Sequence, residues 1–201
     1  MTALDDLLAQ LAADIDGLSA PAASGLFAGC CQALRPHYRR WAEHRGTDDG
    51  DVLDAALGAA GRFATSGAVE AGADALLERV EAATPPGDAP DEYSSTFAQS
   101  CWICGDLALR TAVSQDGGPG HGIEYALDPV VTTATERLYG VSQVGSGPDE
   151  EAQMLVILAE PDVRAAVEAC RAIIAQLAGR PVLTEDDLQA ARERLAPLSP
   201  P

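Results

Sequence analysis

The sequence contains no lysine and few aromatic residues, and both shortages limit what the chain can be. All thirteen cations are arginine, against 31 acidic residues, so the formal net charge is −18 over 201 residues. Phosphate contacts need clustered cations, so this charge argues against sequence-independent binding of nucleic acid. With aromatic residues at only 4%, the core must be filled mainly by alanine, leucine and valine. The absence of lysine, together with abundant Ala, Gly, Asp and Pro, is typical of a GC-rich bacterial genome and indicates no function.

The sequence also lacks a long apolar run and a basic leader. No segment approaches the roughly 20 apolar residues that cross a bilayer. The first eighteen residues, MTALDDLLAQLAADIDGL, have neither the cations nor the apolar stretch of a signal peptide. We therefore expect a soluble, cytoplasmic protein without membrane association.

The five cysteines form no disulfide framework, because their number is odd and two of them are adjacent. Cys101 and Cys104 make a lone C-x-x-C. A redox motif of this kind places its first cysteine at a helix N-terminus, whereas about two turns of helical pattern precede Cys101. A structural zinc would need two further ligands at similar spacing. Buried thiols on a helix face are the favoured interpretation, with neither metal nor cofactor.

Helical periodicity dominates the chain, and no strand-like alternation recurs. It predicts an all-α, single bundle-like domain of about seven to nine helices over residues 1–178, with a kinked central helix. A linker, a short helix opened by Thr184 and a frayed proline tail follow over residues 179–201. The expected helices cover residues 3–18, 26–46, 52–63, 69–83, 91–113, 123–139, 149–158 and 161–177.

Three segments between or within these helices carry separate expectations. Residues 19–24 are expected to be a break, and the glycine-rich residues 115–122 an exposed loop that lacks the Lys-Ser or Lys-Thr of a phosphate loop. Asp128 and Pro129 are a plausible cap and first position within the sixth helix. The β-branched run at residues 130–135 leaves a strand open as an alternative.

The central helix, residues 26–46, holds most of the unusual residues. Pro36 cannot donate to the Gln32 carbonyl, so a kink is expected there. Four of the thirteen arginines lie within the eleven residues 35–45 of this helix. They complement the helix dipole or, alternatively, form an anion-binding or acidic-partner patch. His37 and His44 are about 10 Å apart at helical rise and cannot share one metal ion. We expect His37 to fill hydrogen-bond vacancies made by Pro36, with proton transfer involving Tyr38 or Asp106 as the alternative.

Several stretches resemble the DUF416 family of uncharacterised bacterial all-α proteins. They are Phe27-Ala28, residues 34–38, Trp41, Gly46, Val52-Leu53, Ala56-Leu57, Asp91, Tyr93, residues 101–109 and residues 153–158. The resemblance covers roughly residues 24–178 and implies a helical fold without an assigned activity. His37 stands where the family usually has asparagine, and Ser100 stands where an aspartate is expected.

Two functions remain open, and the sequence does not decide whether the protein is an enzyme. The favoured hypothesis is a non-enzymatic protein-binding module that covers a basic partner, as an immunity protein does. The alternative is a small-molecule enzyme or binder with a cleft beside Pro36. Homo-oligomerisation through an alanine-rich helix face is compatible with both. The candidate binding residues are Arg35, His37, Tyr38, Arg39, Trp41, Tyr93, Ser100, Cys101, Cys104 and Asp106.

Overall fold

The protein folds as a single all-α domain, as the sequence predicts. The computed structural model describes residues 2–46, 49–85, 93–114, 120–141 and 149–199, and the side chains of these except residues 93–95. Its helices are α1 (Ala3–Asp16), α2 (Ala20–Arg45), α3 (Gly50–Ser66), α4 (Ala73–Ala83), α5 (Tyr93–Ser114), η1 (Gly120–Gly122), α6 (Ile123–Tyr139), α7 (Glu150–Ala159), α8 (Pro161–Leu177), α9 (Glu185–Arg194) and η2 (Ala196–Leu198).

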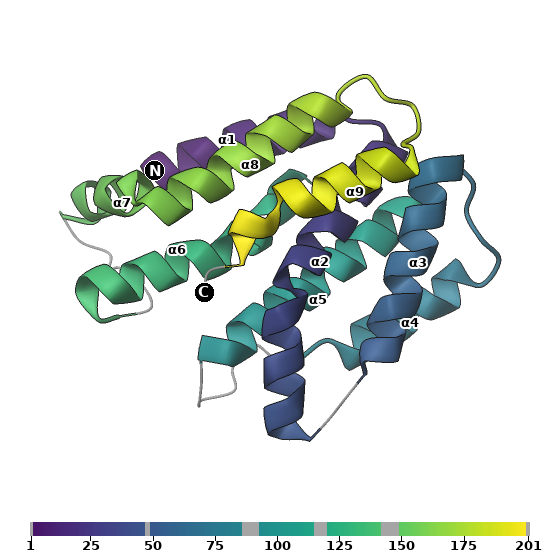
Figure 1. Ribbon diagram of the computed structural model, residues 1–201, viewed down its shortest axis with the longest axis horizontal. Helices are drawn as coiled ribbons and strands as arrows, with labels where there is room; N and C mark the ends of the chain where they lie inside the picture. The colour runs from purple at the N-terminus through teal and green to yellow at the C-terminus, as the bar shows by residue number, and fades with distance from the viewer. Residues whose placement is uncertain (1, 47–48, 86–92, 115–119, 142–148, 200–201) are drawn as a thin grey trace.

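Helices α2 and α5 pair along the middle of the molecule, and this is the most extensive helix contact of the described chain. On one side of the pair lie α3 and α4, and on the other lie α1, α6, α7 and α8 (Figure 1). Helix α9 lies over α2 and contacts α8, so it joins the two sides.

Small residues let α2, α3 and α5 approach one another closely. The Ser24 hydroxyl of α2 lies 2.8 Å from the Ala108 carbonyl oxygen of α5 and 3.4 Å from the Ala60 carbonyl oxygen of α3. A Cβ added to Gly105 of α5 would stand 2.6 Å from the buried Leu53 side chain and 3.3 Å from Cys31 Sγ. The shortage of aromatic residues is thus met by close helix packing rather than by large side chains.

Helix α2 begins earlier than the sequence predicts. The expected break at residues 19–24 is wrong, because Ser19 caps the helix and its Oγ accepts from the Ala22 N–H at 3.2 Å. Pro21 falls in the first turn, where its missing N–H is not needed. Helix α2 continues through Pro36 to Gly46, whose φ of 68° ends it. The kink at Pro36 stays a prediction.

Helix α6 spans the predicted residues, and the strand alternative for residues 130–135 is wrong. Pro129 lies inside the helix rather than at its start. The turn before it holds Ile123, Ala126 and Leu127, which are buried, so packing keeps that turn helical despite the proline. Within the expected exposed loop, residues 115–119 lie outside the described chain, whereas Gly120 and Gly122 are buried in η1.

The C-terminal segment is part of the core and is not the frayed tail that the sequence predicts, as far as Ser199. Thr184 opens α9 with a capping box, as expected. Leu195 and Leu198 are fully buried beyond it, and the Ser199 hydroxyl contacts His37 of α2. Pro197 lies in the short 3-10 turn η2, and Leu195 and Leu198 anchor the segment.

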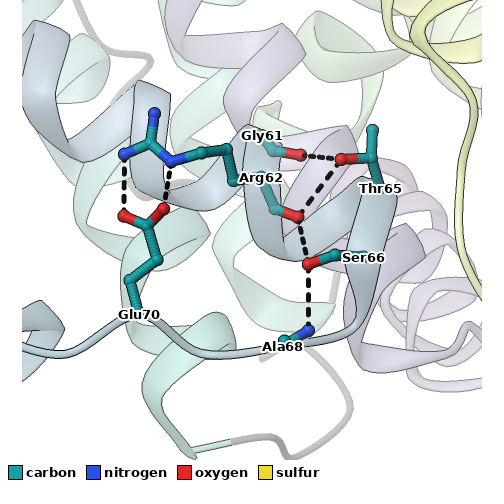
Figure 2. Close-up of polar contacts among 6 residues, drawn as sticks. All are labelled: Gly61, Arg62, Thr65, Ser66, Ala68 and Glu70. Atoms are coloured by element: carbon teal, nitrogen blue, oxygen red, sulfur yellow. Dashed lines mark hydrogen bonds and ion pairs between the residues drawn. The ribbon is translucent and has the colours of Figure 1, made fainter.

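Local hydrogen bonds fix the junction between α3 and α4. Figure 2 shows Ser66, whose hydroxyl donates to the Arg62 carbonyl and accepts from the Ala68 N–H at 3.1 Å. The Arg62 guanidinium forms a two-pronged pair with Glu70, with Nη2 2.8 Å from Oε2. Both side chains are exposed, so water and salt screen this pair and it contributes little to stability.

We expect Gly105→Ala to lower the free energy of unfolding by about 1–3 kcal/mol, because the added methyl group overpacks the α2–α3–α5 contact. Gly61→Ala is the matched control, since the nearest atom to its Cβ, Leu188 Cδ1, is 4.0 Å away. It should leave stability unchanged or raise it by up to about 1 kcal/mol. Urea denaturation followed by circular dichroism measures both, and equal effects would contradict close packing at Gly105.

Candidate functional site

The candidate residues on α2 divide among different surroundings, because successive residues of a helix point about 100° apart. Arg35, Tyr38 and Arg39 line a cavity of about 300 Å³ between α2 and the start of α3. His37 faces the C-terminal segment instead. The single cleft beside Pro36 that the sequence suggested is therefore not formed by these residues together.

In the α2–α3 cavity two of the charged side chains are paired with each other. The Arg35 guanidinium forms an ion pair with Asp54, and its hydrogen bond lowers the pKa of that carboxyl. The Tyr38 hydroxyl accepts from the Asp49 N–H at 3.1 Å, which holds the first turn of α3. These contacts join α3 to α2, so Arg35 and Tyr38 serve the packing of the two helices.

His37 is buried, with 7% of its surface exposed, and its ring meets Phe97 edge-on at 5.1 Å between centroids. Arg40 Nη2 lies 3.4 Å from Nδ1, and Ser199 Oγ lies 3.0 Å from Nε2. Because arginine only donates, Nδ1 accepts and Nε2 carries the proton toward Ser199. Burial, and then the Arg40 charge, lowers the pKa of His37 from 6.5 to about 4. His37 thus joins α2 to the chain terminus, and neither Tyr38 nor Asp106 receives a hydrogen bond from its ring.

Aromatic rings surround Tyr38 at the contact of α2 with α5. The Tyr38 ring lies 5.6 Å from Trp102, edge to face, and 6.1 Å from Trp41. Trp102 is fully buried, and Trp41 is partly buried against the core. Such ring pairs stabilise a core beyond the apolar area that they bury. Trp41 is therefore placed as a packing residue.

All five cysteines are free and fully buried, as the buried-thiol interpretation predicts. Cys101 Sγ lies 3.7 Å from Cys31 Sγ and donates to the Cys31 carbonyl oxygen at 3.3 Å. Burial raises the pKa of Cys30, Cys101 and Cys104 far above the usual thiol range and that of Cys170 to about 12. These thiols stay protonated and shielded from solvent, so they act as small core residues.

The remaining candidates, Tyr93, Ser100 and Asp106, belong to α5. Asp106 is engaged by Arg110 of its own helix, whose Nε and Nη2 each lie 3.1 Å from one carboxylate oxygen. Burial raises the pKa of Asp106, and the Arg110 hydrogen bond opposes this. Ser100 is buried, and the side chain of Tyr93 lies outside the described residues. Asp106 is therefore held by an arginine of its own helix.

An exposed apolar surface lies at the end of α6 and on α7, and the sequence interpretation missed it. We call it the α6–α7 surface, and its residues are Leu138, Tyr139, Val141, Leu155 and Val156. Leu155 is 54% exposed and Val156 48%. Arg137 reaches Glu160 at 2.6 Å and Asp162 at 2.9 Å, which brings the α6 end to the α7–α8 junction (Figure 1).

The signal for this surface was present in the sequence as the apolar run at residues 154–158, MLVIL. A helix on the surface buries only one stripe, so consecutive apolar residues must leave some exposed. In the structure Met154 and Ile157 are buried, whereas Leu155 and Val156 face outward.

The described residues hold neither a metal-binding cluster nor a membrane-spanning helix. They contain no group of three or more His, Cys, Asp and Glu side chains arranged to hold a metal ion. Within the same residues, every helix is too short or too polar to span a bilayer.

The described helices form an all-α bundle. A protein of known structure has a similar fold. No family profile matches the chain, and no curated protein matches it in sequence. The crystal structure of a DUF416 family protein from Shewanella baltica is similar over 92% of each chain, with a TM-score of 0.69 and 19% identity. At this identity the likeness establishes the fold, and the predicted resemblance to the DUF416 family is confirmed at that level.

The buried His37 makes stability depend on pH. The unfolded chain takes up a proton near pH 6.5, whereas the folded chain resists it until about pH 4. Stability is therefore full above pH 6.5 and falls as the pH drops through this window, by about 2 kcal/mol at pH 5. We expect the His37→Asn variant to lose no such stability between pH 7.5 and pH 5. Free energies of unfolding from urea denaturation at the two pH values measure this. His44→Asn, an exposed histidine of the same helix, should keep it, and an unchanged slope in His37→Asn would contradict the assignment.

Proposed function

We propose that this protein is a distant member of the DUF416 group that binds another protein through the α6–α7 surface. The partner presents an apolar segment bordered by cationic side chains. The exposure of Leu155 and Val156 carries this proposal. Leu138, Tyr139 and Val141 at the end of α6 are exposed as well, and exposed large apolar residues that gather on one region mark protein-interaction sites.

The charge around this surface supports a cationic partner. Between residues 136 and 162 the sequence has six acids, Glu136, Asp149, Glu150, Glu151, Glu160 and Asp162, and one cation, Arg137, which gives a net charge of −5. Arg137 is already paired with Glu160 and Asp162. The net charge of the whole chain, −18, has the same sign and would speed the encounter with a basic protein.

A small-molecule cleft beside Pro36 has less support. Asp54 is paired with Arg35 beside that cleft, and the cysteines are shielded from solvent. His37 faces the C-terminal segment. Catalysis needs a base within reach of both a nucleophile and the substrate. His37, with its lowered pKa and both ring nitrogens engaged, is poorly suited to that role.

The proposal is tested by comparing three forms of the tagged protein in affinity capture from the native host. The Leu155→Ser, Val156→Ser double variant alters the α6–α7 surface, and Val69→Ser, Val182→Ser alters two exposed valines elsewhere. We expect wild type and the control to retain a basic protein in near-stoichiometric amount, and the surface variant to lose at least about 90% of it, as for the loss of central apolar contacts. Raised salt should slow the association.

Two outcomes would contradict the proposal. Retention of the same protein by the surface variant would place the interface elsewhere. If sedimentation shows that the wild type is a dimer and the surface variant a monomer, the surface binds a second copy of this chain. Unfolding curves for all three forms show whether the substitutions act on binding or on stability.

A further inference from the structure

A cavity between α1 and α6 is separate from the α2–α3 cavity and from the α6–α7 surface. Its volume is about 310 Å³, and its walls are Leu4 and Leu8 of α1 with Glu124, Tyr125, Leu127, Asp128 and Val131 of α6. We propose that it binds a small organic cation, an alkylammonium or alkylguanidinium whose chain lies on the leucines and whose charged end meets Glu124 and Asp128. This inference does not depend on the proposed function.

The walls of this cavity are mainly apolar, and Glu124 and Asp128 are its charged residues. The leucines and Val131 pack partly buried against the core, and the Tyr125 ring adds an aromatic face. Apolar walls with a few convergent polar groups are the usual form of a small-molecule site. At about 30 Å³ of liquid volume for each water molecule, the space fits a ligand of about ten non-hydrogen atoms.

The two carboxylates select a cation. Glu124 and Asp128 are four residues apart, so they share one face of α6 and repel each other. Burial, with the Glu124 charge as a further cause, raises the pKa of Asp128. The hydrogen bond recorded for the Asp128 carboxylate comes from the Thr132 hydroxyl, at 3.4 Å. A bound cation would remove the repulsion and replace lost solvation.

Three other acids of this chain are each paired with an arginine. Asp106 pairs with Arg110, Asp187 with Arg180 at 3.3 Å, and Asp54 with Arg35. Among the described residues, no arginine lies within ion-pair distance of Glu124 or Asp128. Glu124 and Asp128 therefore border the cavity without an arginine counter-charge among the described residues. A guanidinium donates to carboxylates in parallel and stacks on an aromatic face, which suits both acids and Tyr125.

The test uses n-hexylguanidinium, which has ten non-hydrogen atoms by its formula, roughly the number that the volume admits. Calorimetric titration should give a Kd below about 1 mM at low salt. The methyl resonances of Leu4 and Leu8 should shift with the same saturation curve. Hexanol and hexanoate, which keep the chain and lose the cation, should bind at least about tenfold more weakly, as expected for the loss of a charge-assisted contact.

Variants assign the charge contact to these residues. Asp128→Asn and Glu124→Gln should each weaken hexylguanidinium binding by about tenfold. Glu78→Gln on α4 removes one exposed charge far from the cavity and should leave the affinity within about twofold, because exposed charges at this distance are screened. Thermal unfolding checks that each variant folds. Leu8→Ala, which removes a wall without touching a charge, should weaken hexylguanidinium and hexanol alike.

Three results would overturn the inference. They are the absence of saturable binding to wild type, equal binding of hexylguanidinium and hexanoate, and equal losses in Asp128→Asn and Glu78→Gln. A fourth arm uses acetyl-Leu-Arg-Leu-amide. If only this peptide binds and the free cation does not, the cavity receives a side chain of a protein rather than a small ligand, and the proposal fails.

Discussion

The close contact of α2 with α5 is the constraint on which the rest of the structure depends. A chain with few aromatic residues obtains a dense core by bringing helix backbones together, and Gly105, Ser24 and Cys31 are small enough to permit this. Helix α3 packs on both helices, and α9 closes over α2. Four of the five cysteines lie on α2 and α5, where they serve as small core residues.

This constraint also decides where function is to be sought. The side chains of α2 that look reactive in sequence are used to hold neighbouring elements: Arg35 and Tyr38 hold α3, and His37 holds the C-terminal segment. The helices α1, α6 and α7 lie outside the close α2–α3–α5 contact. They carry the cavity with two acids that lack a described arginine partner and the apolar residues that no described element covers.

Much of the fold could be predicted from the sequence, because apolar periodicity marks helices whatever their partners. The bounds of α6 and α8 were predicted correctly, and burial of Cys101 and Cys104 followed from the position of Cys101 within its helix. Errors arose where tertiary packing overrides local preference. Pro129 lies inside α6, and Pro21 lies in the first turn of α2. Leu195 and Leu198 anchor the segment that precedes Pro200.

The candidate site was harder to predict, since reactivity depends on neighbours distant in sequence. His37 looked titratable, yet Phe97 and Ser199 bury it. The pairing of Asp106 with Arg110 was readable at four-residue spacing, as was the apolar run of α7. The cavity between α1 and α6 required the antiparallel packing of two helices more than 100 residues apart, which no local pattern encodes.

The central proposal is that a partner binds to α6 and α7 rather than beside the arginines of α2, of which Arg35 is paired with Asp54. Site-specific photocrosslinking in the native host tests it most directly, with a benzophenone side chain at position 155 in one form and at position 39 in another. Both positions are exposed. The account predicts a single dominant adduct with a basic protein from position 155 and none from position 39. An adduct from position 39 alone would contradict it.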